Sequence, residues 1–143
     1  MKHREIRYLI VCASNTQALE NLTVKDLSIR DRKKGYLATK YHYVITRDGV
    51  IEEGRSITDA GAYLEDGHSI IKNNNSLGVC LIGGSDSNGE SFFNYSSVQI
   101  FSLNTLVTQL KTDYPQLITL GLNDVTKTKE PHFNVEEFMK NGK

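Results

Sequence analysis

The chain has 143 residues, and its 17 lysines and arginines balance 17 acidic residues, so its formal charge at pH 7 is zero. This length fits one domain spanning residues 1–143, which can bury roughly 70% of the unfolded surface. The charge balance argues against a protein that grips nucleic acid or an acidic membrane through its overall field. The sequence shows no secretory signal and no membrane span. We therefore expect a cytoplasmic protein with no direct nucleic-acid or membrane partner.

The first part of the chain predicts a buried strand followed by a helix. Residues 7–13 form a short apolar run that is β-branched in part, as in a covered strand. Thr23 and Asp26 stand at the spacing of a capping box. The pattern therefore predicts a helix over about 24–34 that stops at Gly35, where a glycine favours the end of a helix.

A hairpin and a second buried strand follow. Residues 41–46 alternate and are rich in aromatic and β-branched side chains, and an Asp-Gly turn at Gly49 leads into residues 50–54. Residues 77–82 are apolar throughout, which is typical of a strand covered on both faces.

The second half of the chain predicts two more helices and a short strand. Ser96 opens a capping signal, and apolar residues at helical spacing follow it to Tyr114. Residues 117–120 predict a strand, and Asn134 is placed to cap a last helix. Strands alternate with helices along the chain, so we expect an α/β fold with one mixed sheet flanked by helices.

The two cysteines, Cys12 and Cys80, each lie within an apolar run. Two cysteines do not make a disulfide framework. Free cysteine often behaves as a small core residue. We therefore expect two buried thiols on neighbouring strands.

Several stretches, taken in order, resemble the type 2 N-acetylmuramoyl-L-alanine amidases, a family that includes phage lysozymes and peptidoglycan recognition proteins. The stretches read LIVCASNT, YHYVITRDGVIEEGR, AGAY, NSLGVCLIGG and EPHFN, and they occupy residues 9–16, 41–55, 60–63, 75–84 and 130–134. No single motif decides the resemblance. It depends on their order and spacing, and it covers the chain from about residue 6 to residue 138.

The resemblance implies the family's fold and its reaction, hydrolysis of the amide between the lactyl group of muramic acid and L-alanine. In the family a zinc ion polarises the carbonyl and activates water. Such a site needs three protein ligands and one open position. The family's ligands are a histidine on the first strand, a histidine after the long helix, and a cysteine or aspartate near the end. A tyrosine and, in phage enzymes, a lysine assist the reaction.

Carried onto this sequence, the ligand positions fall on Cys12, Leu122 and Glu130. Leucine cannot bind a metal, and a lone carboxylate binds zinc weakly. The assisting tyrosine is retained as Tyr41, whereas Thr128 stands at the position of the assisting lysine. The resemblance therefore predicts a degenerate zinc site and no cofactor, although zinc is usual in the family.

We accordingly expect a pseudoenzyme that keeps the family's groove. The groove-lining candidates are His42, Tyr63 and Asn75. Such a protein would bind peptidoglycan fragments, as non-catalytic peptidoglycan recognition proteins do. The other hypothesis is a regulator that binds a protein partner such as an RNA polymerase, which a phage lysozyme of this family also binds through a surface apart from the zinc. A phage-encoded protein in a host cytoplasm fits this second hypothesis.

Three enzymatic alternatives stay open at this point. The first is an active N-acetylmuramoyl-L-alanine amidase, an endolysin, with a rearranged metal site of Cys12, Glu130 and His132. The second is a nucleophile pair of Cys12 and His42, which needs a lowered thiol pKa. The third is a glycosidase using the carboxylates of residues 52–53. Those two glutamates lie on the predicted hairpin, where a solvated surface is expected.

Overall fold

The computed structural model describes residues 4–65 and 68–141 and contains a five-stranded mixed sheet in the order β3-β2-β4-β1-β5. The parallel pairs are β1 with β4, β1 with β5 and β2 with β4, whereas β2 and β3 are antiparallel. The strands are β1 (Tyr8–Ala13), β2 (Tyr43–Ile45), β3 (Ile51–Glu53), β4 (Ser76–Leu81) and β5 (Ile118–Gly121). The expected α/β class with one mixed sheet is confirmed.

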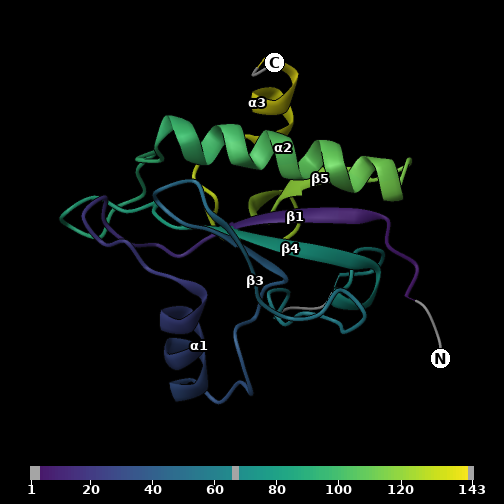
Figure 1. The fold of residues 1–143 in the computed structure, drawn as a ribbon, viewed down its shortest axis with the longest axis horizontal. Helices are drawn as coiled ribbons and strands as arrows, with labels where there is room; N and C mark the ends of the chain where they lie inside the picture. Colours follow the sequence, from purple (N-terminus) through teal and green to yellow (C-terminus); the bar gives the residue numbers. More distant parts are fainter. Residues whose placement is uncertain (1–3, 66–67, 142–143) are drawn as a thin grey trace.

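Helices cover both faces of this sheet (Figure 1). The long helix α2 lies along one face and α1 stands on the other, while α3 sits beside β5 beyond α2. The helices are α1 (Val24–Lys33), α2 (Ser97–Asp113) and α3 (Val135–Asn141), and the short 3-10 helices are η1 (Asn73–Asn75) and η2 (Leu122–Asp124). Within residues 4–65 and 68–141, no helix has the length and hydropathy needed to cross a bilayer.

The two long helices begin where the capping signals predict. Thr23 accepts a hydrogen bond from the amide of Asp26, whose carboxylate accepts one from the Thr23 amide in return. Ser96 and Gln99 make the same reciprocal pair at the start of α2. Each box satisfies two amides that a helix N-terminus leaves without partners.

The hairpin departs from expectation in two ways. Its first strand is shorter than 41–46, because Tyr41 and His42 pair irregularly: their carbonyls accept from the consecutive amides of Arg55 and Gly54. Glu52 is also more than solvated surface. Its carboxylate accepts a hydrogen bond of 2.8 Å from the Val24 amide, and so it adds to the cap of α1.

Alternation along β1 divides the core in two, because successive side chains of a strand point to opposite faces. Leu9 and Val11 pack under α2, whereas Ile10 and Cys12 pack on the α1 side. The α2 side also contains four buried residues of the helix: Leu103, Leu106, Val107 and Leu110. Burying each such side chain contributes about 1.5–3 kcal/mol, so this face stabilises the sheet.

The α1 side carries the two thiols together with Tyr41 and Tyr63. Cys12 and Cys80 are register partners on β1 and β4, both are buried, and neither forms a disulfide. This confirms the expectation of buried thiols on neighbouring strands. Both strands run parallel and end at the same edge. Loops at the carboxyl ends of parallel strands are the usual place for a site in such folds.

Candidate functional site

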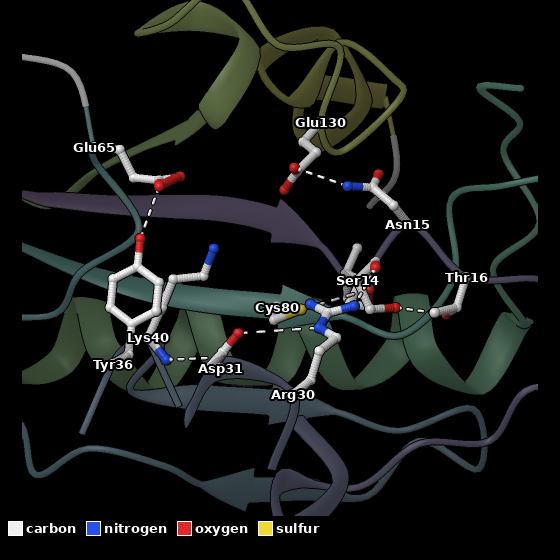
Figure 2. A network of polar contacts seen from close by, with 11 residues as sticks. Ser14, Asn15, Thr16, Arg30, Asp31, Tyr36, Lys40, Glu65, Cys80 and Glu130 are labelled. Atoms are coloured by element: carbon white, nitrogen blue, oxygen red, sulfur yellow. Dashed lines mark hydrogen bonds and ion pairs between the residues drawn. The ribbon is translucent and has the colours of Figure 1, made fainter. Parts of the chain in front are cut away.

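The three positions that correspond to the family's zinc ligands meet at the carboxyl ends of β1 and β5. Cys12 is the penultimate residue of β1, Leu122 follows β5 directly in η2, and Glu130 lies in the loop before α3. The Glu130 carboxylate reaches the end of β1, as Figure 2 shows. The chain therefore brings these three positions to one rim of the sheet.

Cys12 is fully buried in an apolar cluster that also contains Tyr41, Cys80 and Leu122. Burial raises the pKa of its thiol well above the ordinary value, and the negative charge of Glu130 raises it further. The sulfur lies 3.9 Å from the carbonyl oxygen of Ile10, its hydrogen-bond acceptor. Since the thiolate is the form that attacks or binds metal, the raised pKa makes this thiol a poor nucleophile at neutral pH.

Leu122 belongs to the same cluster and is only 7% exposed. Its side chain offers no lone pair, and its carbonyl is used locally, accepting from the amides of Val125 and Thr126. The hydroxyl of Thr126 donates to that carbonyl as well. Leu122 therefore forms an apolar floor next to Cys12.

Glu130 uses both of its carboxylate oxygens. Oε1 accepts a hydrogen bond of 3.0 Å from the Ala13 amide, and Oε2 accepts one of 2.9 Å from Nδ2 of Asn15. Hydrogen bonds to a carboxylate are stronger than neutral ones. These two join the loop of residues 125–134 to the end of β1 (Figure 2).

Tyr41 and Thr128 stand at the positions that assist catalysis in the family: Tyr41 lies in the cluster of Cys12 and Leu122, and Thr128 lines the pocket beside Glu130. The Tyr41 phenol is buried, which raises its pKa well above the ordinary value, and the nearby thiols and Glu130 add to that effect. Its ring stacks on Tyr63 at 6.4 Å between centroids. Thr128 accepts a hydrogen bond from the Glu130 amide through its hydroxyl, 3.3 Å away.

The three groove-lining candidates fall in different environments. A pocket of about 210 Å³ beside Glu130 is lined by Tyr63, but His42 and Asn75 are not among its lining residues. The Tyr63 ring packs against Gly78 and its hydroxyl lies 2.6 Å from the Ser76 hydroxyl. The side chain of Asn75 closes its own loop, donating to the carbonyl of Ile70 and accepting from the Lys72 amide.

His42 is fully buried and bonded through both ring nitrogens. Nδ1 accepts from the Gly78 amide at 3.0 Å, so Nε2 carries the hydrogen and donates to the Asp59 carbonyl at 2.7 Å. Burial lowers its pKa from 6.5 to about 4, and the guanidinium groups of Arg4 and Arg55 contribute to the lowering. The Cys12 thiol is bonded elsewhere, so these hydrogen bonds do not join the two residues of the suggested nucleophile pair.

A polar cluster on α1, which the sequence reasoning missed, lies beneath the rim (Figure 2). Arg30 donates to the Ser14 carbonyl at 2.7 Å, and Asp31 accepts from the Lys40 amide at 3.1 Å. Asp31 is fully buried, and 3.9 Å separates its Oδ1 from Nε of Arg30. The available signal was spacing, because Asp31 follows the buried Leu27 by one helical turn and shares its face.

His132, named above in the rearranged metal site, also has both ring nitrogens in hydrogen bonds. Nδ1 lies 2.7 Å from Oγ of Ser91, and Nε2 lies 2.5 Å from Oδ1 of Asn15. Burial lowers its pKa, while the charge of Glu130 opposes the lowering. Over the described part of the chain, no group of three or more histidine, cysteine, aspartate or glutamate side chains is arranged to hold a metal ion.

The fold places the chain among amidase-like α/β proteins. The endolysin amidase LysCS of Clostridium intestinale superposes with a TM-score of 0.76 at 21% identity, over 96% of this chain and 83% of that one. A variant of Drosophila PGRP-LB in complex with tracheal cytotoxin gives 0.72 at 20% identity, over 96% and 83% of the two chains. At this level of identity the likeness concerns the fold.

Sequence comparison then identifies the family. The family model for N-acetylmuramoyl-L-alanine amidase matches residues 2–132. The endolysin of Enterobacteria phage K11 is 30% identical over 141 residues, which is 99% of this chain and 90% of that endolysin. The chain belongs to the N-acetylmuramoyl-L-alanine amidase family.

The lowered pKa of His42 makes stability depend on pH. Unfolding restores the ordinary pKa of 6.5, so the unfolded chain takes up a proton between that value and about 4 while the folded chain does not. This contribution is full above pH 6.5 and is lost as the pH falls toward 4, by up to about 3 kcal/mol. Urea unfolding at several pH values measures it. His42→Asn, which keeps an acceptor for the Gly78 amide, should reduce the dependence of the unfolding free energy on pH between 4 and 6.5. An unchanged pH dependence would contradict the assignment of this effect to His42.

Replacing Glu130 by alanine removes both hydrogen bonds to the end of β1. We expect the free energy of unfolding to fall by about 2–4 kcal/mol, since the part-buried bond from Ala13 to the charged group contributes about 1.5–3 kcal/mol and the exposed bond from Asn15 contributes less. Glu65→Ala is the matched control, because that exposed carboxylate accepts a single bond from the Tyr36 hydroxyl. Its loss should stay below about 1 kcal/mol. Equal losses in the two variants would show that Glu130 does not fasten the loop.

Proposed function

We propose that this protein binds peptidoglycan fragments at the pocket beside Glu130 and does not hydrolyse them with zinc. One observation carries the proposal: the three ligand positions supply at most two metal donors, because the side chain of Leu122 has none. Burial raises the pKa of the Cys12 thiol, the Leu122 side chain has no lone pair, and both oxygens of Glu130 already accept hydrogen bonds. A catalytic zinc needs three protein ligands. These residues do not fit the ion, and so no reaction step is assigned to it.

The pocket beside Glu130 suits part of a peptide-bearing ligand. Leu122 and Tyr63 give it an apolar wall, and Lys127 and Thr128 lie on its rim together with Glu65. Its volume of about 210 Å³ is below the roughly 300–1,000 Å³ of a pocket that encloses a drug-sized molecule. It therefore receives one portion of a longer ligand, with Lys127 facing a carboxylate or carbonyl oxygen and Glu65 facing an amide. Peptidoglycan stems supply both groups.

Family membership supports the same ligand class. The relatives include endolysins, and the PGRP-LB variant is seen in complex with tracheal cytotoxin. The near-full-length match to endolysins also favours a second candidate, an active N-acetylmuramoyl-L-alanine amidase with a rearranged metal site of Cys12, Glu130 and His132. A protein partner such as an RNA polymerase stays a prediction from the resemblance.

Metal analysis combined with a cell-wall assay separates the two candidates. The purified protein should contain far less than one zinc per chain and should leave the turbidity of a cell-wall suspension unchanged, even with added zinc. The endolysin of phage K11 serves as the positive control. Stoichiometric zinc together with a chelator-sensitive loss of turbidity would replace our proposal by the active amidase.

Binding is tested by calorimetric titration with purified muropeptides. We expect measurable heat at millimolar ligand, and Lys127→Glu should weaken binding at least tenfold because it puts a negative charge where the pocket offers a cation. Lys111→Glu is the matched control, since Lys111 lies on α2, across the sheet from the pocket. Absence of heat with the wild-type protein, or equal weakening by the two charge reversals, would sink the proposal.

A further inference from the structure

A line of hydrogen bonds runs from Glu130, beside the pocket, to the exposed Ser91. Glu130 accepts from Nδ2 of Asn15 at 2.9 Å (Figure 2), and Oδ1 of Asn15 lies 2.5 Å from Nε2 of His132. Nδ1 of the same ring lies 2.7 Å from Oγ of Ser91. The four connected side chains come from three loops: the loop after β1, the loop before α3 and the loop after β4. No step of the proposed function uses Ser91.

The chemistry of the end groups fixes each proton along this line. A carboxylate only accepts, so Asn15 must turn its amide nitrogen to Glu130 and its oxygen to His132. That oxygen only accepts in turn, so Nε2 of His132 carries the hydrogen. Nδ1 is then the acceptor, and the Ser91 hydroxyl donates to it. A serine hydroxyl held against a neutral imidazole, whose other nitrogen is oriented by an amide, has the arrangement of an activated nucleophile.

The backbone is shaped to hold this arrangement. Among the described residues, Asn15 and His132 are the only non-glycine residues with positive φ, at 59° and 75°. This conformation is uncommon outside glycine, and such residues gather at functional sites. Gly84 makes room for the ring, because a methyl group there would lie 2.6 Å from Cδ2 of His132. Asn15 and His132, which are distant in sequence and both have a left-handed backbone conformation, therefore meet through their side chains.

Ser91 is exposed and its own amide is not used by the hairpin that contains it. Ser85 and Ser91 face each other in an antiparallel bridge. The flanking hydrogen bonds run from the Asp86 amide to the Glu90 carbonyl and from the Phe92 amide to the Gly84 carbonyl. In this pattern the facing pair does not exchange hydrogen bonds. The Ser91 N–H therefore stays available to a developing oxyanion.

We propose that Ser91 is a nucleophile for metal-independent acyl transfer from esters, with His132 as its general base and Asn15 as the residue that positions the ring. Oγ of Ser91 forms a bond to the acyl carbon while its proton passes to Nδ1 of His132. The bond from the acyl carbon to the leaving oxygen breaks, and that oxygen takes the proton and departs as an alcohol. Water then attacks the acyl-serine with the same base, which releases the acid and restores the hydroxyl.

The probes are p-nitrophenyl acetate and a fluorophosphonate, each used with the full chain in the presence of EDTA. We expect one acetyl or phosphonyl group per chain by intact mass, placed on Ser91 by peptide mapping. Ser91→Ala should abolish the adduct. Ser87→Ala is the matched control, because Ser87 is exposed in the same hairpin and lies outside the line of hydrogen bonds. In this variant Ser91 should be labelled at the wild-type rate.

The role of His132 is tested with His132→Asn, since asparagine tolerates a positive φ and so preserves the backbone. We expect its labelling to slow by at least about 100-fold, the lower end of what a general base contributes. Far-ultraviolet circular dichroism and thermal unfolding verify that the variant is folded. Absence of an adduct on the wild-type protein, similar labelling of Ser87 and Ser91, or a folded His132→Asn variant that labels at the wild-type rate would overturn the proposal. Muropeptide titration is independent of this result, so the two proposals fail separately.

Discussion

The Glu130 carboxylate accepts hydrogen bonds from the Ala13 amide and from Asn15, and these bonds join the loop before α3 to the end of β1. A carboxylate at a half-buried rim needs such donors, because its desolvation is otherwise unfavourable. Once this loop is held, its next residues are in place as well. The Pro131 carbonyl accepts a hydrogen bond of 2.7 Å from the Tyr95 hydroxyl, and the ring of His132 is hydrogen-bonded to Asn15. The shape of the rim therefore follows from one ionised side chain.

The two faces of the sheet are covered by clusters of different composition. The α2 side packs a large apolar cluster against the strands, and the buried polar side chains of α2, Gln99 and Ser102, donate hydrogen bonds to backbone carbonyls. The α1 side mixes apolar residues with the buried thiols, Tyr41 and the polar cluster of Arg30 and Asp31. Alternation along the same strands produces both faces. A site can therefore change on one side while the other side preserves the fold, which is consistent with the strong likeness in fold at low identity.

Local chemistry explains what could be predicted from the sequence. The capping residues Thr23 and Ser96 mark the starts of their helices because their partners lie within one turn. The apolar runs that become β1 and β4 indicate covered strands because that pattern is also local: it lies within each run. The hydrogen bonds of Glu130 and His132 could not be foreseen, because their partners lie 117 residues or 41 residues away in the chain. The burial of Asp31 depends on which face of α1 turns inward, and the packing of Leu27 on the sheet decides that.

The adjacent thiols of Cys12 and Cys80 have a consequence for the redox behaviour of the molecule. Both are fully buried, and burial raises the pKa of each. Oxidants attack the thiolate, and susceptibility rises with solvent access. In the native chain, peroxide or glutathione therefore meets neither thiol of the central sheet, and both cysteines stay reduced under oxidising conditions that leave the fold intact.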